Sequence, residues 1–132
     1  MGKHVKAYQK CGDYYYSIND KRSAMTFYKK AAELGDLQSY NNIGLMFEMG
    51  FDDKLPEPEK AIENYKFAHY KGNSDATINL AIYYLNGRFM KPDQTVGKAL
   101  LTQAYKDRNP RSVDCMLTYG LIKNKNEVDG FI

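Results

Sequence analysis

The chain has 132 residues and a net charge of +3, from 19 basic and 16 acidic residues, and 43% of its residues are hydrophobic. This length allows one domain with a real core that needs neither disulfides nor metals, and the interspersed charges exclude the strong positive field typical of proteins that bind nucleic acid or anionic lipid. Because no window approaches the run of about 20 apolar residues that a membrane-spanning helix needs, we expect no direct membrane insertion.

Periodic apolar residues, separated by glycine, proline and polar turn residues, predict helices along most of the chain. The expected helices cover residues 5–16, 23–34, 37–49, 58–71, 75–85, 94–107 and 112–122. Ser23 is expected to cap the second helix, and Pro58 to lie in the first turn of the fourth. Gly35 and Gly72 are expected to end the second and fourth helices in the left-handed conformation.

Two segments of the chain recur. Residues 24–35 return as 61–72, with a worn third copy that starts at Ala99, and residues 42–50 return as 79–87. Self-similarity of this length indicates an array in which each helix pair buries its apolar face against its neighbours. The sequence therefore predicts an all-α protein, a right-handed α-α superhelix of about three helix-turn-helix repeats plus a terminal helix.

Small residues recur at one position of the expected first helices and at one position of the second helices. They are Gly12, Gly44, Ala81 and Gly120 in the first helices, and Ala24, Ala61 and Ala99 in the second. Because glycine inside a helix costs about 1 kcal/mol relative to alanine, this recurrence predicts that two helix backbones approach closely there. Tyr15, Phe47 and Tyr84, three residues after the first three slots, are expected to fill the space beside them.

These residues resemble the Sel-one-like repeat, a relative of the tetratricopeptide repeat. The second unit matches the pattern at Asn42, Ile43, Gly44, Phe47, Gly50, Ala61, Tyr65, Ala68 and Gly72. The first unit matches at Gly12, Tyr15, Ala24, Phe27, Tyr28, Lys30, Ala31, Ala32 and Gly35. The third unit departs from the pattern, with Ala81 in place of glycine and Gln103 where an aromatic residue is expected.

The resemblance covers the chain as far as Ile122. It implies a repeat domain over residues 1–122, with repeats at about 5–36, 37–73 and 74–110 and a terminal helix at 112–122, followed by a polar tail at 123–132. The spacing of 37 residues from Ala24 to Ala61 exceeds the 34 residues of a tetratricopeptide repeat, which favours the Sel-one-like relative.

The resemblance also implies a function: a non-catalytic adaptor or scaffold for protein–protein interaction, acting as a subunit of a larger complex. The first helices of the related tetratricopeptide family line a concave face, so a groove for a partner's helix or extended peptide is expected there. Its predicted residues are Gln9, Asp13, Asn41, Asn42, Leu45, Met49, Ile78, Asn79, Ile82, Asn86, Leu117 and Leu121.

Two alternatives to this groove stay open. Some of its apolar residues would instead be ordinary core between repeats. The amides of Asn42 and Asn79 would either bind a peptide backbone or cap a loop carbonyl inside the scaffold. For the function itself, a chaperone-like assembly factor is the first alternative to an adaptor, and an enzyme or small-ligand binder is the second.

Catalysis finds little support in the sequence. His4 and His69 are the chain's two histidines, and neither has a nearby cysteine or acidic pair in a nucleophile arrangement. Neither a phosphate-binding glycine loop nor zinc-ligand spacing occurs. We therefore expect no enzyme activity, no cofactor and no metal.

Both ends of the array carry information. Cys11 and Cys115 lie too far apart in an extended solenoid to pair, which favours reduced thiols and a reducing, cytoplasmic location. After the terminal helix the polar tail offers only Val128, Phe131 and Ile132 as apolar anchors, so we expect it to cover that helix weakly. Self-association through the C-terminal end is the consequence of such weak cover.

Overall fold

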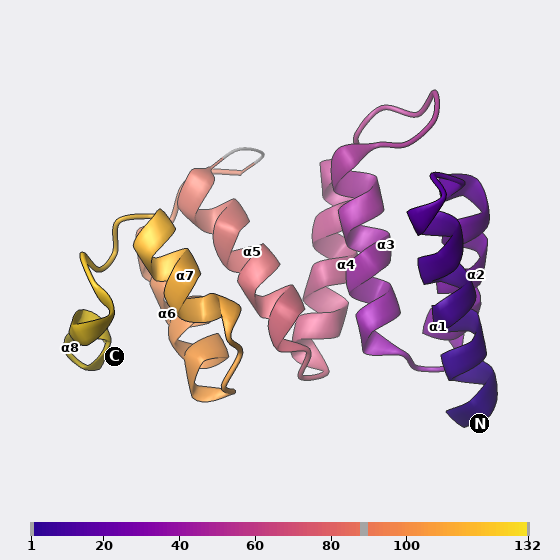
Figure 1. The fold of residues 1–132 in the computed structure, drawn as a ribbon. Coiled ribbons are helices and arrows are strands. Elements are labelled where there is room, and N and C mark those ends of the chain that lie inside the picture. Colours follow the sequence, from indigo (N-terminus) through magenta and orange to yellow (C-terminus); the bar gives the residue numbers. More distant parts are fainter. Residues whose placement is uncertain (1, 88–89, 132) are drawn as a thin grey trace. The chain divides into compact units, whose positions relative to one another are not determined.

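The computed structural model describes residues 2–87 and 90–131, and these residues form helices joined by short loops (Figure 1). The helices are α1 (Gly2–Ser17), α2 (Lys21–Glu33), α3 (Leu37–Met49), α4 (Pro58–Tyr70), α5 (Ser74–Asn86), α6 (Gln94–Lys106), α7 (Arg111–Thr118), the 3-10 helix η1 (Lys125–Glu127) and α8 (Val128–Phe131). No strand occurs in the described residues. The expected all-α fold is confirmed.

The helices pack as consecutive antiparallel pairs, α1 with α2, α3 with α4 and α5 with α6. The chain forms two compact units. The N-terminal unit extends to Lys71 and holds the first two pairs, with α2 also packed on α3. The C-terminal unit begins at Gly72, and there α7 packs on both α5 and α6.

Four of the helices start at an acidic or amide residue whose side chain accepts a hydrogen bond from the backbone N–H three residues ahead. These caps are Asp20, Asp36, Asn73 and Asp93. The expectation that Ser23 caps α2 is wrong, because the Asp20 carboxylate accepts from the Ser23 N–H at 3.2 Å and also from the Ser23 hydroxyl at 2.9 Å. Asp20 is the N-cap because its carboxylate, on a short side chain, reaches the free backbone N–H groups of the first turn.

The second helix of each pair ends at a residue in the left-handed conformation. Gly35 and Gly72 have φ values of +96° and +102°, as expected for helix-ending glycines. After the third pair the same place is held by Arg108 at φ +63°. A side chain there costs energy that glycine avoids, so the third repeat keeps the turn without its preferred residue.

The glycines of the first helices make room for a tyrosine ring, not for a second backbone. A Cβ atom at Gly12 would lie 2.5 Å from Cε1 of Tyr28, and one at Gly44 would lie 2.5 Å from Cε1 of Tyr65. Both tyrosines come from the second helix of the same pair and are buried. The expected close approach of two helix backbones is therefore wrong, because the close contact at these glycines is with a tyrosine side chain.

The rings expected beside these glycines lie elsewhere. Tyr15 stacks on Phe27, with ring centroids 5.5 Å apart and an interplanar angle of 1°. Phe47 is partly buried and packs against the core cluster of the N-terminal unit. The prediction was wrong because it took the ring from the glycine's own helix. A residue three positions along shares the glycine's face, but the ring that lies over the glycine comes from the second helix of the pair.

The third pair, α5 and α6, has a smaller side chain than tyrosine at the corresponding buried position. Its buried small residue is Gly97, and Ala99 is exposed, so the register expected from Ala99 is wrong by two residues. Leu101, four residues after Gly97, is fully buried in one cluster with Ala81. Leu101 thus holds in α6 the position that Tyr28 and Tyr65 hold in α2 and α4, and Ala81 holds in α5 the position of Gly12 and Gly44.

The terminal helix is shorter than expected. It ends at Thr118, and Gly120 follows it with φ +68°, so Gly120 ends the helix and does not occupy a packing slot inside it. Ile122 and Val128 are each 5% exposed and belong to the core of the C-terminal unit, and Phe131 packs against that core. Ile132, the last expected anchor, lies outside the described residues.

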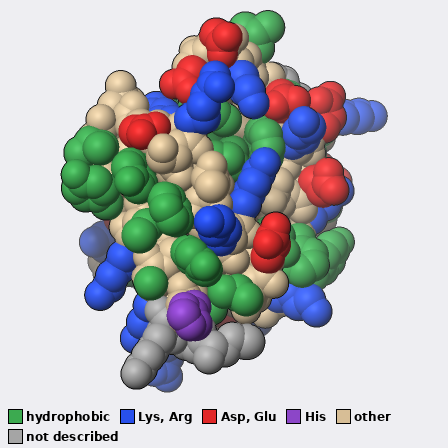
Figure 2. Space-filling model, turned by 90° about the vertical axis from the view of Figure 1, so that its right-hand side faces the viewer, with side chains coloured by type: hydrophobic (Ala, Val, Ile, Leu, Met, Phe, Trp, Pro, Cys, Tyr) green, Lys and Arg blue, Asp and Glu red, His purple; other side chains and the backbone are tan. Residues whose placement is uncertain are grey.

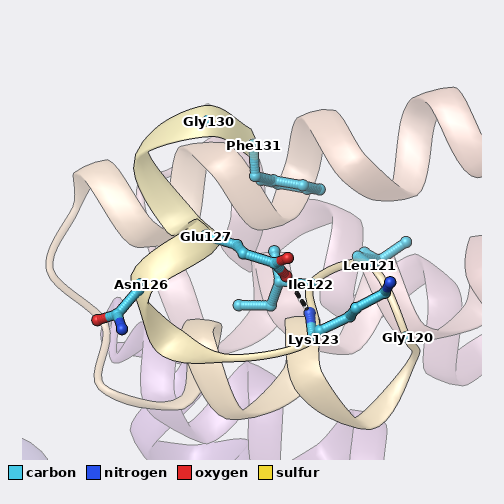
Figure 3. A pocket seen from close by; sticks show the side chains of 8 residues that line it. All are labelled: Gly120, Leu121, Ile122, Lys123, Asn126, Glu127, Gly130 and Phe131. Carbon is cyan, nitrogen blue, oxygen red and sulfur yellow. Dashed lines mark hydrogen bonds between the residues drawn. The ribbon is translucent and has the colours of Figure 1, made fainter.

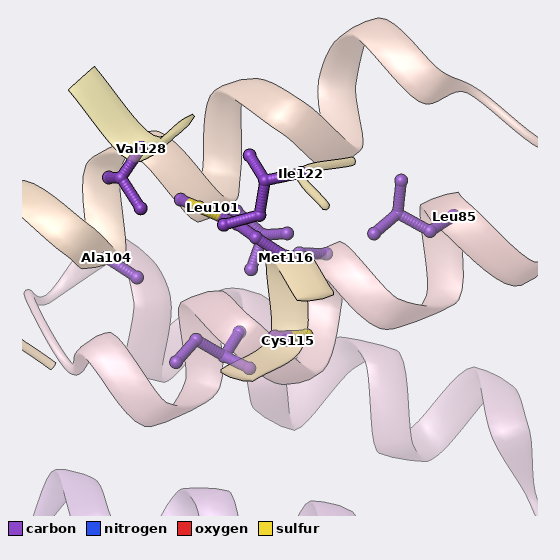
Figure 4. Packing of buried hydrophobic residues seen from close by; sticks show 9 residues of the cluster. Leu85, Leu101, Ala104, Cys115, Met116, Ile122 and Val128 are labelled. Carbon is purple, nitrogen blue, oxygen red and sulfur yellow. The ribbon is translucent and has the colours of Figure 1, made fainter. Parts of the chain in front are cut away.

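The tail thus covers the terminal helix more fully than expected. In Figure 4 the side chains of Ile122 and Val128 lie in one cluster with Leu101 and Met116. Leu101 and Met116 are fully buried. Burying apolar area stabilises a fold by about 25 cal/mol per Å², so the buried side chains of the tail stabilise the C-terminal unit. The weak cover that suggested end-to-end association is not found.

Candidate partner-binding surface

The predicted groove residues divide evenly between the two units. Gln9, Asp13, Asn41, Asn42, Leu45 and Met49 belong to the N-terminal unit. Ile78, Asn79, Ile82, Asn86, Leu117 and Leu121 belong to the C-terminal unit.

In the C-terminal unit most of the predicted residues support the core. Ile78 is fully buried within the cluster of that unit, and Asn79 is 6% exposed. Ile82, Leu117 and Leu121 are partly buried and pack against the same cluster. These residues therefore belong to the core or border it, as the alternative to a binding groove expected. Of this set, only Asn86 is exposed.

In the N-terminal unit the predicted residues are more accessible. Asn41 is buried, at 2% exposure, but Gln9, Asn42 and Leu45 are partly exposed. Met49 is 59% exposed, although it is a large apolar side chain on a helix. This unit therefore presents apolar side chains from α3 to solvent.

A small pocket lies among three helices of the N-terminal unit. It is lined by Tyr16 of α1, Tyr28 of α2, and Asn42 and Leu45 of α3, and its volume is about 170 Å³. We call it the Tyr28 pocket. Drug-sized ligands occupy pockets of roughly 300–1,000 Å³, whereas a cavity of about 150 Å³ holds a single benzene ring. The Tyr28 pocket is therefore the size of one side chain.

One wall of this pocket is fixed by a charge-assisted hydrogen bond. The Tyr28 hydroxyl donates to Oδ1 of Asp13 at 2.6 Å. Burial, and next the hydrogen bond to the Asp13 carboxylate, raise the pKa of Tyr28 well above its ordinary value. The phenol therefore stays a neutral donor at physiological pH, and it holds the exposed Asp13 carboxylate beside the pocket.

The second pair repeats this arrangement. The Tyr65 hydroxyl donates to Oε1 of Glu48 at 2.8 Å. The carboxylate follows its glycine by one residue in Asp13 and by four in Glu48, so the two copies reach the tyrosine hydroxyl from different positions of the first helix. The tyrosine–carboxylate bond is thus a scaffold feature of this chain, and the pocket is what distinguishes its first copy.

Sequence reasoning missed the two tyrosines of the pocket. In the run from Tyr14 to Tyr16, Tyr14 is 58% exposed, Tyr16 is 38% exposed and Tyr15 is partly buried. A signal for Tyr28 did exist, because it follows Ala24 by four residues as Tyr65 follows Ala61. That interval places each ring beside its small residue on the buried face of the helix.

Two of the larger hollows, one in each unit, lie at other places. One, of about 450 Å³, is lined by His4, Tyr8, Lys30, Glu33 and Leu34 at the start of α1 and the end of α2. Figure 2 views the molecule from the side where Figure 1 draws α1 and α2, and it shows hydrophobic side chains gathered in the lower half of this face, with charged side chains spread over the rest. The Lys30 ammonium lies over the rings of Tyr8 and Phe27, at 5.5 and 5.4 Å.

The other hollow, of about 500 Å³, lies within the C-terminal unit around the tail (Figure 3). Its residues are Gly120, Leu121, Ile122, Lys123, Asn126, Glu127, Gly130 and Phe131. The Glu127 carboxylate accepts a hydrogen bond from the Lys123 backbone N–H, which closes the turn between α7 and η1. This contact explains how a polar tail keeps its fold.

Neither metal nor membrane features are present in the part of the chain that the structure describes. Within residues 2–87 and 90–131, no three His, Cys, Asp or Glu side chains gather as metal ligands would. None of the helices described there has the length and apolar character needed to cross a bilayer.

The sequence model of the Sel1 repeat matches the chain three times, at residues 5–36, 37–73 and 74–109. The chain belongs to the Sel1 repeat family. Sel1 repeat proteins generally mediate protein–protein interactions, and their fold is a typical non-catalytic interaction scaffold. Among curated protein sequences, none matches this chain significantly.

Solved Sel1 structures share the fold. A Sel1 repeat protein from Oxalobacter formigenes superposes with a TM-score of 0.77 at 23% identity, over 96% of this chain and 56% of that protein. A protective antigen present in uropathogenic Escherichia coli strains, which displays an SLR fold, superposes with a TM-score of 0.72 at 25% identity, over 89% of this chain and 26% of the antigen. This chain therefore spans about half of one Sel1 relative and a quarter of the other.

Proposed function

We propose that this Sel1 repeat protein is a non-catalytic adaptor, a subunit of a larger complex that binds a helix or an extended peptide of a partner protein on its N-terminal unit. The observation that carries this proposal is the Tyr28 pocket, with the 59% exposed Met49 on the helix that supplies two of its walls. Partner helices and peptides insert single side chains into pockets of this kind. The general role of Sel1 repeats in protein–protein interaction supports the same conclusion.

We further propose a reducing, cytoplasmic location for this adaptor. Both cysteines are free, with Cys11 partly buried and Cys115 buried. Burial raises the pKa of the Cys115 thiol, which keeps it protonated and unreactive. Unpaired cysteines are typical of proteins from reducing compartments.

The test compares two leucines of the N-terminal unit. Leu45 lines the pocket, while Leu55 lies in the loop between α3 and α4 and is 83% exposed. Tagged chains that carry Leu45→Arg or Leu55→Arg undergo the same chemical change at the two places. We expect one stoichiometric partner to co-purify with the original chain and with Leu55→Arg, and to be lost with Leu45→Arg.

Circular dichroism of both variants would show whether they keep the helical content of the original chain. Equal recovery of the partner with a folded Leu45→Arg variant would contradict binding at this surface. The absence of any specific partner with the original chain would contradict the adaptor itself.

A further inference from the structure

The chemistry around the Tyr28 pocket indicates which side chain it receives. The pocket holds about 170 Å³, and the side chains of Tyr16 and Leu45 give it apolar walls. Its other lining residues are Tyr28, whose hydroxyl is bonded to Asp13, and Asn42, whose amide is a polar group. Its occupant therefore needs both an apolar stem and a polar end.

A carboxylate, that of Asp13, contacts one of the residues that line the pocket. Asp13 is exposed, and Tyr28, whose hydroxyl lies 2.6 Å from Asp13 Oδ1, lines the pocket. Among the described residues no lysine or arginine forms an ion pair with Asp13, and no hydrogen bond to the side-chain amide of Asn42 occurs. An apolar side chain would strip water from the Asn42 amide and leave it without a partner, which is costly. A cationic side chain would compensate the charge.

The aromatic wall suits a cation as well. The Lys21 ammonium already lies 5.5 Å from the centroid of the Tyr16 ring, although Lys21 does not line the pocket. A planar guanidinium stacks on an aromatic ring and also forms paired hydrogen bonds with a carboxylate, and it holds its water less tightly than an ammonium does. Arginine therefore fits this site better than lysine.

We propose that the Tyr28 pocket receives one arginine side chain of the partner segment, whose methylene stem packs between Tyr16 and Leu45 and whose guanidinium pairs with the Asp13 carboxylate. This inference rests on the proposed adaptor function and names the chemistry that the adaptor reads. The partner segment is thus basic at the position that inserts, and Asn42 is placed to bond to its remaining polar groups.

The probes for a test are small molecules that copy side chains. Propylguanidinium copies the arginine side chain, butylammonium copies lysine, and propylurea has the shape of propylguanidinium without its charge. Two-dimensional ¹H–¹⁵N spectra of the full chain would follow each titration. We expect propylguanidinium to shift the amide signals of Asp13, Tyr16, Asn42 and Leu45, and propylurea to bind roughly threefold more weakly, since an exposed ion pair contributes little more than this.

Two variants that each remove one carboxylate charge sharpen the result. Asp13→Asn keeps an oxygen that accepts from the Tyr28 hydroxyl, so its fold should persist, but it should bind propylguanidinium no better than propylurea. Glu48→Gln is the matched control, because Glu48 accepts from the Tyr65 hydroxyl in the same way, but Tyr65 does not line the pocket as Tyr28 does. It should bind both probes as the original chain does.

Several results would overturn the arginine site. They are equal binding of the charged and neutral probes by the original chain, shifts located away from the pocket, no shifts at all, or an unchanged preference in Asp13→Asn. The comparison of probes on the original chain needs no variant, so it holds even if Asp13→Asn unfolds. The probe titrations contain no partner protein, so their failure differs from a failure of the adaptor proposal. If Leu45→Arg loses the partner but propylguanidinium does not bind, the adaptor proposal stands and the arginine site is wrong.

Discussion

A Cβ atom added at Gly44 would stand 2.5 Å from Cε1 of Tyr65, a distance that side chains in folded proteins do not adopt. Tyr65 is fully buried, so its ring has no free space to move into. The hydroxyl of the same ring is anchored to Glu48 at 2.8 Å. The glycine, the ring and the carboxylate therefore act as one unit that fixes how α3 and α4 pack.

Gly44→Ala is expected to destabilise the protein in spite of alanine's better helix propensity. Overpacking costs about 1–3 kcal/mol and the propensity gain returns about 1 kcal/mol, so we expect a net loss of up to about 2 kcal/mol in the free energy of unfolding. Urea denaturation would measure it. Gly130→Ala is the control, because a Cβ atom there would meet nothing within 4 Å, and it should be neutral or slightly stabilising.

Combining Gly44→Ala with Tyr65→Leu would reproduce the alanine–leucine combination that Ala81 and Leu101 form in the third pair. We expect the double variant to lose less stability than the two single variants lose together, by about 1 kcal/mol, because the added methyl group fills space that the smaller side chain leaves. Strict additivity in the double-mutant cycle would show that the residues at 44 and 65 do not compete for the same space.

Alkaline pH should weaken the fold through Tyr28. Its pKa is raised in the folded state by burial and by Asp13, so above the unfolded value, near pH 10, the unfolded chain binds fewer protons than the folded chain. The contribution is fully present below about pH 10 and falls as the pH rises further, by up to about 1.4 kcal/mol per pH unit. Unfolding at a series of pH values would show a shallower alkaline decline in Tyr28→Phe, whereas Tyr14→Phe should keep the original decline.

The left-handed residue after a second helix should affect stability in opposite directions when a side chain is added to it in one repeat and removed from it in another. Gly35→Ala places a side chain at φ +96° where nothing lies within 4 Å, so it should cost about 1–2 kcal/mol through backbone strain alone. Arg108→Gly relieves the same strain at φ +63° and should stabilise the protein by up to about 1 kcal/mol. Thermal unfolding of the two variants would check both signs, and a stabilising Gly35→Ala would refute this reading.

The tail should prove necessary for the C-terminal unit. Val128 is 5% exposed within the core cluster, and Val128→Ala is expected to cost about 1–2 kcal/mol through lost burial and the cavity it leaves. Lys125→Ala, at an exposed position of the same tail, should change stability by less than about 0.5 kcal/mol. Amide hydrogen exchange would locate the loss, and we expect faster exchange in α6 and α7.

Much of this fold could be predicted from the sequence, because its repeats place glycine, alanine and apolar residues at fixed helical intervals. The helices and the close-packed slots at Gly12 and Gly44 followed from that periodicity. The identity of the ring in each slot did not, since it depends on which helix crosses the glycine. The register of the third pair failed for a related reason: Ala99 matched the pattern in letters, but Gly97 lies on the buried face.

The candidate site could be predicted less well than the fold. Leu45 and Asn42 were expected on the first helices of the repeats, and the structure places both at a pocket. Ile78 was expected there by the same reasoning and lies fully buried. Position along a helix gives the face on which a residue lies, but the fraction left exposed depends on neighbouring helices and on a tail whose packing no repeat pattern specifies.

The alanine–leucine combination of the third pair limits how its helices could be exchanged. If α4 replaced α6 as the partner of α5, the Tyr65 ring would meet the methyl group of Ala81, where α3 offers it a bare glycine. The helices of this array are therefore matched couples, and recombination between repeats during evolution would succeed only when both members of a couple moved together.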